Sequence, residues 1–337
     1  MPRVFSGIQP SGDMHLGNFI GAVRRWAAAQ PAPDSAAAAA AESIYCVVDM
    51  HAMTLAYAPD ELRGRTRELA TLLLASGIDP ERSLLFVQSH VGGLHGECTW
   101  LLNCTATDGE LRRMTQFKDK SKGQESVSAA LYDYPVLMAS DIVLYNTDEV
   151  PVGDDQRQHV ELARDIAIRF NGRFGDTFVV PKATFPKAGA RIMDLQQPTK
   201  KMSKSDGESS GCVFVLDTPS RIAKKIKSAV TDSDTAVRYD VDAKPGVSNL
   251  LDIYAAATDR SVADVAAELA TSQYGALKVA VADAVVALLE PVQQRYAELT
   301  ADPAEVDRVL ACGAARAREI AAPVLERALT NAGLLRP

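Results

Sequence analysis

The sequence predicts an α/β protein: a Rossmann-like, doubly wound parallel sheet with a helical insertion, followed by an all-helical C-terminal domain. Three observations lead to this fold class. Short continuous apolar runs, typical of strands buried on both faces, alternate with helical periodicity in the N-terminal half. A turn rich in glycine and proline follows the first of these runs. Beyond Cys212 only helical periodicity remains.

The first strand is expected over 4–7, and it enters a turn punctuated by Gly7, Pro10 and Gly12. A helix is expected over 17–30, because apolar side chains recur on one of its faces. A strand, a glycine-rich turn and a helix N-terminus form a common site for phosphate groups. The turn is neither a Walker A loop nor a Gly-x-Gly-x-x-Gly motif.

Two further strands and a helix continue the predicted sheet. The expected elements are strands over 44–49 and 83–88 and a helix over 59–76. His51 and Gln88 would then lie at the carboxyl edge of the sheet, where parallel α/β folds bind ligands. Residues 31–43, with six consecutive alanines from Ala36 to Ala41, are expected to form a surface insertion without an assigned function.

The region from about 93 to 148 is expected to be a helical insertion between the two halves of the sheet. The expected elements are helices over 97–104, 110–117 and 135–145 and a charged loop over 118–125. Pro135 is expected to begin the last of these helices, since proline is favoured in a first turn. That helix carries one carboxylate, Asp141, among apolar residues.

The remaining elements close the sheet and form the C-terminal helices. The expected elements are extended runs over 150–152, 178–180 and 191–193 and helices over 155–171, 219–230, 249–257, 262–270, 275–298 and 303–334. Pro291 and Pro323 are expected to kink or split the last two helices. The predicted domains are a Rossmann-like domain over 1–211 and a helical domain over 212–337.

Composition narrows the class of protein. The chain has 337 residues, of which 47% are hydrophobic, so a sizeable core is expected. A net charge of −7 argues against non-specific coating of nucleic acid but allows one nucleic acid bound through local basic patches. The five scattered cysteines form no Cys-x-x-Cys pair, so neither a metal site nor a disulfide framework is expected. Without a secretory segment or ~18 consecutive apolar residues, a cytoplasmic protein with no membrane attachment is expected.

A lysine-rich stretch, Lys200-Lys201-Met202-Ser203-Lys204-Ser205, lies between Pro198 and Gly207. Its flanks indicate a loop, and three neighbouring ammonium groups repel one another unless they are solvated or meet an anion. The anion could be a polyphosphate, and the plain alternative is a solvated basic loop. A second stretch, Gln9-Pro10-Ser11-Gly12-Asp13-Met14-His15-Leu16-Gly17-Asn18, favours the polyphosphate.

Several stretches in order carry a resemblance to a known family. They are Phe5 to Gly12, His15 to Asn18, 110–118, 141–147, 150–156 and Lys201 to Ser205. This pattern is similar to that of bacterial tryptophanyl-tRNA synthetases, which are class I aminoacyl-tRNA synthetases, over nearly the whole chain. The general class I signature has a second histidine where this chain has Asn18, as in the tryptophan family, so only His15 could act there as an imidazole.

The resemblance implies a reaction in two steps. The carboxylate of L-tryptophan attacks the α-phosphorus of ATP, giving tryptophanyl-adenylate and pyrophosphate, and Mg²⁺ enters with the ATP phosphates. The tryptophanyl group then moves to the 3′-terminal adenosine of tRNA(Trp). The resemblance also implies that 1–211 is the catalytic domain, that 212–337 reads the anticodon and that the protein is a homodimer. Catalysis of the first step should rest on positioning and fixed positive charge.

The resemblance also assigns the nucleotide site. Lys201 and Lys204 would meet the β- and γ-phosphates, with Ser203 and Ser205 as hydrogen-bond donors. The other implied contacts are Gln9, Pro10, Ser11, Gly17 and Asn18 at the adenosine and α-phosphate, Asp155 at the ribose hydroxyls, Ile192 and Met202 at the adenine, and Gly153 and Asp154 as further nucleotide-binding residues. The plain alternative for Asp155 is an N-cap of the following helix.

Asp141 is the candidate for tryptophan selection. The indole nitrogen only donates, so a selective pocket needs a buried acceptor, and an analogue without the donor can be rejected by ~10⁴-fold or more. Apolar neighbours argue against the alternative of a helix-surface carboxylate. The other implied contacts are apolar walls from Phe5, Met138, Val150 and Val152, and groups facing the amino and carboxyl ends of tryptophan from His51, Gln116, Lys120 and Tyr134. His90, His95 and His159 are assigned no role, since a lone histidine is usually structural.

Two alternatives stay open from the sequence. A tyrosyl-tRNA synthetase shares the architecture, but its pocket must serve a phenol hydroxyl and its lysine loop usually differs from Lys-Met-Ser-Lys-Ser. A non-catalytic relative that binds tRNA or an amino acid should lose phosphate-binding residues, whereas both signature stretches are intact here. Fold by itself does not separate these readings, because one fold serves many functions.

Overall fold

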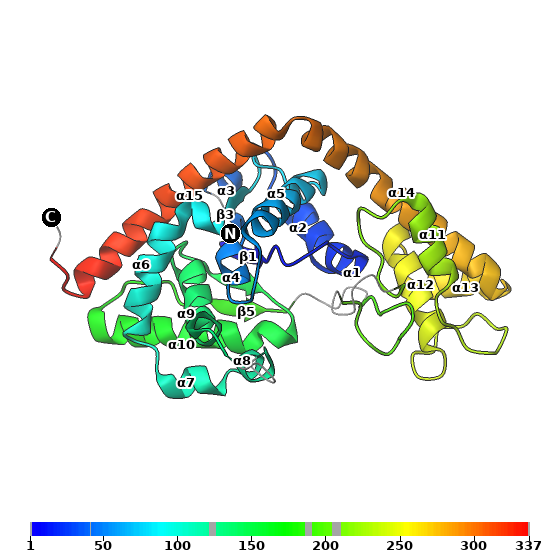
Figure 1. Ribbon diagram of the computed structural model, residues 1–337, viewed down its shortest axis with the longest axis horizontal. Helices are drawn as coiled ribbons and strands as arrows, with labels where there is room; N and C mark the ends of the chain where they lie inside the picture. The colour runs from blue at the N-terminus through cyan, green and yellow to red at the C-terminus, as the bar shows by residue number, and fades with distance from the viewer. Residues whose placement is uncertain (1, 41, 121–125, 186–190, 204–209, 336–337) are drawn as a thin grey trace.

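The fold is described by a computed structural model, which covers residues 2–40, 42–120, 126–185, 191–203 and 210–335 (Figure 1). Five parallel strands form one sheet in the order β3-β2-β1-β4-β5. They are β1 (Val4–Ile8), β2 (Ser43–Val47), β3 (Leu84–Val87), β4 (Glu149–Pro151) and β5 (Lys182–Thr184). β1 lies at the centre and pairs with β2 on one side and β4 on the other. The predicted doubly wound parallel sheet is therefore confirmed.

The fifth strand differs from the prediction. The runs expected over 178–180 and 191–193 are not strands, and β5 instead pairs with β4 through Ala183 opposite Val150. β5 is an edge strand without a continuous apolar run, so the sequence pattern misses it. Phe178 is buried against Phe170 instead, with ring centroids 4.8 Å apart. Met193 forms only an isolated bridge with Lys201.

Helices cover both faces of the sheet, as the alternation of buried side chains requires. On β2, Tyr45 and Val47 join one hydrophobic cluster, whereas Ile44 and Cys46 join the other. The first cluster includes helices α1 (Leu16–Asn18), the π-helical turn η1 (Phe19–Val23), α2 (Arg24–Ala29) and α5 (Pro59–Ala75). The second includes α6 (Gly92–Asn103), α9 (Ala129–Val143) and α10 (Arg157–Phe174). The carboxyl ends of the strands remain open between these two layers.

The insertion between β3 and β4 is helical, but two of its predicted boundaries are wrong. Helix α9 begins at Ala129, after the N-cap Ser128, and passes through Pro135 instead of starting there. An interior proline removes one backbone hydrogen bond, and burial of the neighbouring apolar side chains offsets that loss. The helix predicted over 110–117 is two helices, α7 (Asp108–Arg113) and α8 (Thr115–Lys120). Met114 separates them with an extended backbone, and 118–120 are helical where a loop was predicted.

Short elements complete the core. They are α3 (Ala36–Ala39) in the alanine-rich segment, α4 (Asp49–Ala52) after β2, the 3₁₀ turn η2 (Gln88–Val91) after β3 and the 3₁₀ turn η3 (Asp154–Gln156) before α10. The side chain of Ser35 caps α3 by accepting from the Ala38 amide. The alanine-rich segment, predicted only as a surface insertion, thus contains an ordered helical turn with Ala38 buried.

The C-terminal part consists of helices. They are α11 (Pro219–Lys227), α12 (Pro245–Thr258), α13 (Val262–Leu269), α14 (Tyr274–Ala301) and α15 (Pro303–Asn331). Helices α14 and α15 continue through Pro291 and Pro323, so the predicted split at these residues does not occur. Figure 1 shows the two helices as an arch that runs from the α11–α13 group back across the sheet domain.

Helix α15 packs on the edge strand β3, not on the other C-terminal helices alone. Gly313 allows the contact, because a β-carbon at this position would lie 1.8 Å from the carbonyl oxygen of Leu85. Arg316 donates from its guanidinium to the carbonyl oxygens of Pro80 and Ala38. Helix α15, which belongs to the helical domain predicted over 212–337, therefore covers an edge of the sheet.

Replacing Gly313 with alanine is expected to lower the free energy of unfolding by about 1–3 kcal/mol, because the new methyl group overlaps backbone that cannot move aside. Thermal or urea unfolding of the purified variant measures this. Gly64→Ala is the matched control, because Gly64 lies inside α5 with nothing within 4 Å of a β-carbon. The control should be neutral or more stable by up to ~1 kcal/mol. Equal stability of both variants would contradict the packing of α15 on β3.

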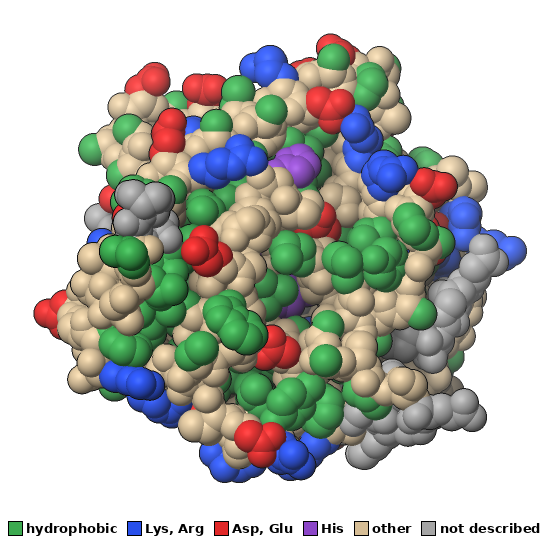
Figure 2. All heavy atoms as spheres, turned by 60° about the vertical axis from the view of Figure 1, so that its left-hand side comes forward, with side chains coloured by type: hydrophobic (Ala, Val, Ile, Leu, Met, Phe, Trp, Pro, Cys, Tyr) green, Lys and Arg blue, Asp and Glu red, His purple; other side chains and the backbone are tan. Residues whose placement is uncertain are grey.

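The surface carries mixed charge. On the face in Figure 2, Lys and Arg side chains are interspersed with Asp and Glu around exposed hydrophobic groups, so this face has no continuous positive surface. Within the described ranges, no helix combines the length and apolar character needed to span a bilayer.

Candidate active site

A cavity of about 580 Å³ opens at the carboxyl edge of the sheet. The end of β1, the following turn, α4, α9 and the segment after β4 form its walls. It brings the two signature stretches together, since Gln9, Ser11 and Asn18 line it from one side and Lys201 and Ser203 from another. Parallel α/β folds bind ligands at this edge.

Backbone pairing explains how two stretches so far apart in the chain meet. The Asp194 amide donates to the Lys200 carbonyl at 2.8 Å, and the Met202 amide donates to the Ile192 carbonyl at 3.1 Å. The next segment returns to the first signature, where the Leu16 amide donates to the Val213 carbonyl at 2.8 Å. Lys200 to Met202 therefore pair with Ile192 to Asp194, and the backbone near Val213 pairs with the first signature stretch at Leu16.

The residues predicted for the nucleotide divide into three groups. Those that line the cavity are Gln9, Ser11, Asn18, Gly153, Lys201, Met202 and Ser203. Among the described residues, those outside its wall are Pro10, Gly17, Asp154, Asp155 and Ile192. Lys204 and Ser205 lie outside the described residues.

Local contacts bear on two residues predicted for the nucleotide, Gly17 and Asp155. His15 caps α1, because its Nδ1 accepts from the Asn18 amide at 3.2 Å, and a β-carbon on Gly17 would lie 3.1 Å from the His15 ring. A side chain at position 17 would therefore crowd the His15 ring, whatever its contact with ligand. The alternative of Asp155 as an N-cap is wrong, because its carboxylate accepts from the Gln156 side chain at 2.9 Å and α10 has no side-chain cap.

Eight of the nine residues predicted for tryptophan line the same cavity. They are Phe5, His51, Gln116, Tyr134, Met138, Asp141, Val150 and Val152. The ninth, Lys120, ends α8, and its side chain lies outside the described part of the chain. The hydroxyl of Tyr134 is 2.8 Å from Nε2 of His159, a histidine to which the sequence assigns no role.

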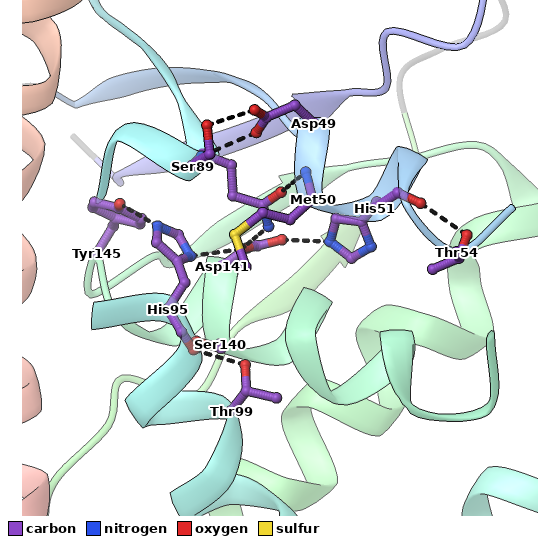
Figure 3. A network of polar contacts seen from close by, with 11 residues as sticks. Asp49, Met50, His51, Thr54, Ser89, His95, Thr99, Ser140, Asp141 and Tyr145 are labelled. Carbon is purple, nitrogen blue, oxygen red and sulfur yellow. Dashed lines mark hydrogen bonds and ion pairs between the residues drawn. The ribbon is translucent and has the colours of Figure 1, made fainter. Parts of the chain in front are cut away.

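Asp141 lies at the centre of a buried network (Figure 3). Its side chain is 2% exposed. Its Oδ2 is 2.8 Å from Nε2 of His51, and its Oδ1 is 2.7 Å from Nδ1 of His95 and 2.7 Å from the donating Nε2 of Gln88. Burial alone would raise the pKa of the Asp141 carboxyl, but hydrogen bonds from His51 and His95 lower it to about 2. The cavity wall therefore contains an ionised acceptor at neutral pH.

The sequence misses part of this network. Gln88 is expected at the sheet edge without a role; it follows β3 directly, whereas His51 lies in α4 after β2. His95 and Tyr145 are assigned no function, yet Nε2 of His95 is 2.8 Å from the Tyr145 hydroxyl, and the other ring nitrogen contacts Asp141. The only available signal was the carboxyl-edge position of Gln88, because no local pattern links residues 46 positions apart such as His95 and Asp141.

Known proteins share this sequence and fold. The family model described as tRNA synthetases class I (W and Y) matches residues 1–290. Tryptophan–tRNA ligase 1 of Streptomyces coelicolor is 50% identical, over 100% of this chain and 98% of the relative. A crystal structure of tryptophanyl-tRNA synthetase from Mycoplasma pneumoniae is 34% identical with a TM-score of 0.88, over 99% of this chain and 98% of that one.

A second crystal structure adds ligands to the comparison. It is tryptophanyl-tRNA synthetase from Campylobacter jejuni complexed with ADP and tryptophan, 32% identical with a TM-score of 0.83, over 98% of this chain and 100% of that one. The family model covers most of the chain, and these relatives match nearly the whole length of this chain. The chain therefore belongs to the class I tRNA synthetases of the W and Y family, and within it to the bacterial tryptophanyl-tRNA synthetases.

Proposed function

We propose that this chain is a tryptophan–tRNA ligase, which activates L-tryptophan with ATP and transfers it to tRNA(Trp). One observation carries the proposal: the ionised carboxylate of Asp141 lies in the wall of the cavity that both signature stretches line. One cavity thus holds an acceptor for an indole N–H and cationic groups for a polyphosphate.

Asp141 and its apolar neighbours form the tryptophan end of the site. Phe5, Met138, Val150 and Val152 would enclose the indole ring, and Asp141 would accept its N–H. Phenylalanine lacks that donor, so binding it would leave a buried carboxylate without its expected partner. His51, Gln116 and Tyr134 would face the amino and carboxyl groups.

Lys201 and Ser203 form the phosphate end. An oxygen of the tryptophan carboxylate forms a bond to the α-phosphorus of ATP while the bond from that phosphorus to the bridging oxygen breaks, and pyrophosphate leaves. The attacking carboxylate is already ionised, so no general base is required. Lys201, together with Lys204, would stabilise the charge that develops on the leaving phosphates, and Gln9, Ser11 and Asn18 would hold the adenosine and α-phosphate.

Mg²⁺ would enter with ATP and be held mainly by its phosphate oxygens and water. Within the described ranges, no group of three or more His, Cys, Asp or Glu side chains is arranged to hold a metal ion. The ion would neutralise part of the polyphosphate charge beside the lysines.

The helical C-terminal part would bind the anticodon of tRNA(Trp), and the protein would act as a homodimer. Light scattering of the purified chain measures the oligomeric state, and a monomer at micromolar concentration would contradict the dimer without affecting the activation step.

Tryptophan-dependent ATP–pyrophosphate exchange tests the proposed activity. We expect exchange with tryptophan and at least about 10⁴-fold less efficient exchange with tyrosine or phenylalanine. Charging of tRNA(Trp) with labelled tryptophan then tests the transfer step. Exchange with tyrosine instead would identify a tyrosyl-tRNA synthetase, and no exchange with any amino acid would favour a non-catalytic relative.

A further inference from the structure

The two oxygens of Asp141 have different surroundings. Oδ2 contacts His51, and both residues line the cavity. Oδ1 contacts Gln88 and His95, which are fully buried and lie outside the cavity wall. Oδ2 therefore lies on the cavity side of the carboxylate, and Oδ1 faces the protein interior.

The donors on Oδ1 are determined by contacts one step further away. Oε1 of Gln88 accepts from the Met50 amide at 3.1 Å, so the Gln88 amide nitrogen must face Asp141. Burial raises the pKa of the Tyr145 phenol well above its ordinary value, so the hydroxyl keeps its proton. Within the described ranges the only hydrogen-bond partner of that hydroxyl is Nε2 of His95 at 2.8 Å, so the arrangement that uses the phenol proton has Tyr145 donating to Nε2. The proton of a neutral His95 then lies on Nδ1, which donates to Asp141.

We propose that His95 is a positioning residue for tryptophan selection: with Gln88 it saturates Oδ1 of Asp141, so that one acceptor position, on Oδ2, remains for the indole N–H. Tyr145 holds His95 in the tautomer that this arrangement requires. A carboxylate has about four acceptor positions, and two donors on Oδ1 with His51 on Oδ2 leave one. The inference rests on the proposed function, since it assumes that tryptophan occupies this cavity.

The arrangement sharpens discrimination because the carboxylate cannot turn away. A ligand without the N–H leaves Oδ2 short of a partner, and rotation of the carboxylate would break the bonds to Gln88 and His95. The backbone of His95 is tied to α9 as well, since the Ser140 hydroxyl donates to its carbonyl at 3.0 Å. Such a site rejects an isosteric ligand that lacks the donor more strongly than a movable carboxylate would.

Two substitutions at His95 separate its two contacts. In His95→Asn the side-chain amide nitrogen can replace Nδ1 as donor to Asp141 but not reach Tyr145. In His95→Gln the longer amide can reach Tyr145, but it leaves the Nδ1 position empty. Tyr145→Phe removes only the hydroxyl that holds the tautomer. Tyr274→Phe is the matched control, because it deletes a hydroxyl bonded to Lys244 and Asp232 in the helical part, away from the cavity.

The measurement is pyrophosphate exchange with tryptophan and with β-(benzothiophen-3-yl)alanine, in which sulfur replaces the indole N–H. We expect His95→Gln to lower the ratio of kcat/KM for tryptophan to that for the analogue by about 10- to 100-fold. The loss should appear as a higher KM for tryptophan with kcat and the KM for ATP nearly unchanged, because the indole contact is made in ground and transition states alike. His95→Asn should lose less, Tyr145→Phe should fall between them, and Tyr274→Phe should keep the wild-type ratio.

An unchanged ratio in folded His95→Gln would overturn the inference. So would equal losses in Tyr145→Phe and Tyr274→Phe, which would indicate general destabilisation. If neither His95 variant folds, Tyr145→Phe decides. A wild-type ratio of kcat/KM for tryptophan to that for the analogue in Tyr145→Phe would contradict the proposed effect of Tyr145 on His95. The wild-type protein separates this test from that of the proposed function: without tryptophan-dependent exchange in the wild type the function fails, whereas exchange with unaltered variants rejects only the inference.

Discussion

Replacing Asp141 with asparagine is expected to raise the KM for tryptophan by about 10²- to 10⁴-fold. The carboxylate accepts from His51, His95 and Gln88 at once. An asparagine side chain has one acceptor oxygen, and its NH₂ group would face at least one of these donors. The variant therefore loses the indole acceptor and leaves a buried donor unpaired. Initial rates of pyrophosphate exchange against tryptophan at saturating ATP measure the change.

Asp133→Asn is the matched control on the same helix. Asp133 accepts from Asn103 at 2.9 Å and lies outside the cavity wall, so its substitution should leave the KM for tryptophan unchanged. An unchanged KM in Asp141→Asn would remove Asp141 from the tryptophan pocket. Equal increases in both variants would point to a defect of α9 and not to a lost contact with substrate.

Replacing Lys201 with alanine is expected to lower the rate of adenylate formation by about 10²- to 10³-fold. Lys201 lines the cavity opposite the first signature stretch, and its ammonium group would be fixed near the leaving phosphates. The KM for tryptophan should stay nearly the same, because the lysine would act on charge that develops in the transition state. The sequence predicts the same effect for Lys204→Ala, at a position outside the described residues.

Single-turnover formation of the adenylate measures the effect of Lys201→Ala without product release. Lys182→Ala is the control, since Lys182 is an exposed lysine on β5 that pairs with Glu149 at 2.9 Å and lies outside the cavity wall. A wild-type rate in Lys201→Ala would show that the lysine stretch is a solvated basic loop. A rise in the KM for tryptophan to match the fall in rate would show that Lys201 shapes the amino-acid pocket instead.

Much of the fold could be predicted where local pattern and burial agree. The strands at 43–47 and 84–87 contain the continuous apolar runs Ile44 to Val47 and Leu84 to Val87, because both faces of each strand are covered. The prediction fails where tertiary contacts override local preference. Pro135 lies inside α9 because the helix is buried along most of its length, and β5 is missed because an edge strand needs no apolar run.

The candidate site shows the same division. Residue types and their order predict one site for Asp141 and both signature stretches, and the cavity wall contains Asp141 together with Gln9, Ser11, Asn18, Lys201 and Ser203 from these stretches. His95 and Tyr145 could not be found in this way, because their contacts reach across the insertion and leave no spacing pattern in the chain.

The sequence by itself determined the fold class and the family, and it predicted residues for tryptophan and ATP, because all of these depend on residue type and order along the chain. Only the tertiary structure showed that α15 covers the edge strand β3 and that Gln88 and His95 form hydrogen bonds with Oδ1 of Asp141. The physical reason is that both contacts require close approach between distant segments. The absence of a β-carbon at Gly313 and the position of a ring nitrogen of His95 decide whether these contacts form. No periodicity in the chain records such distances.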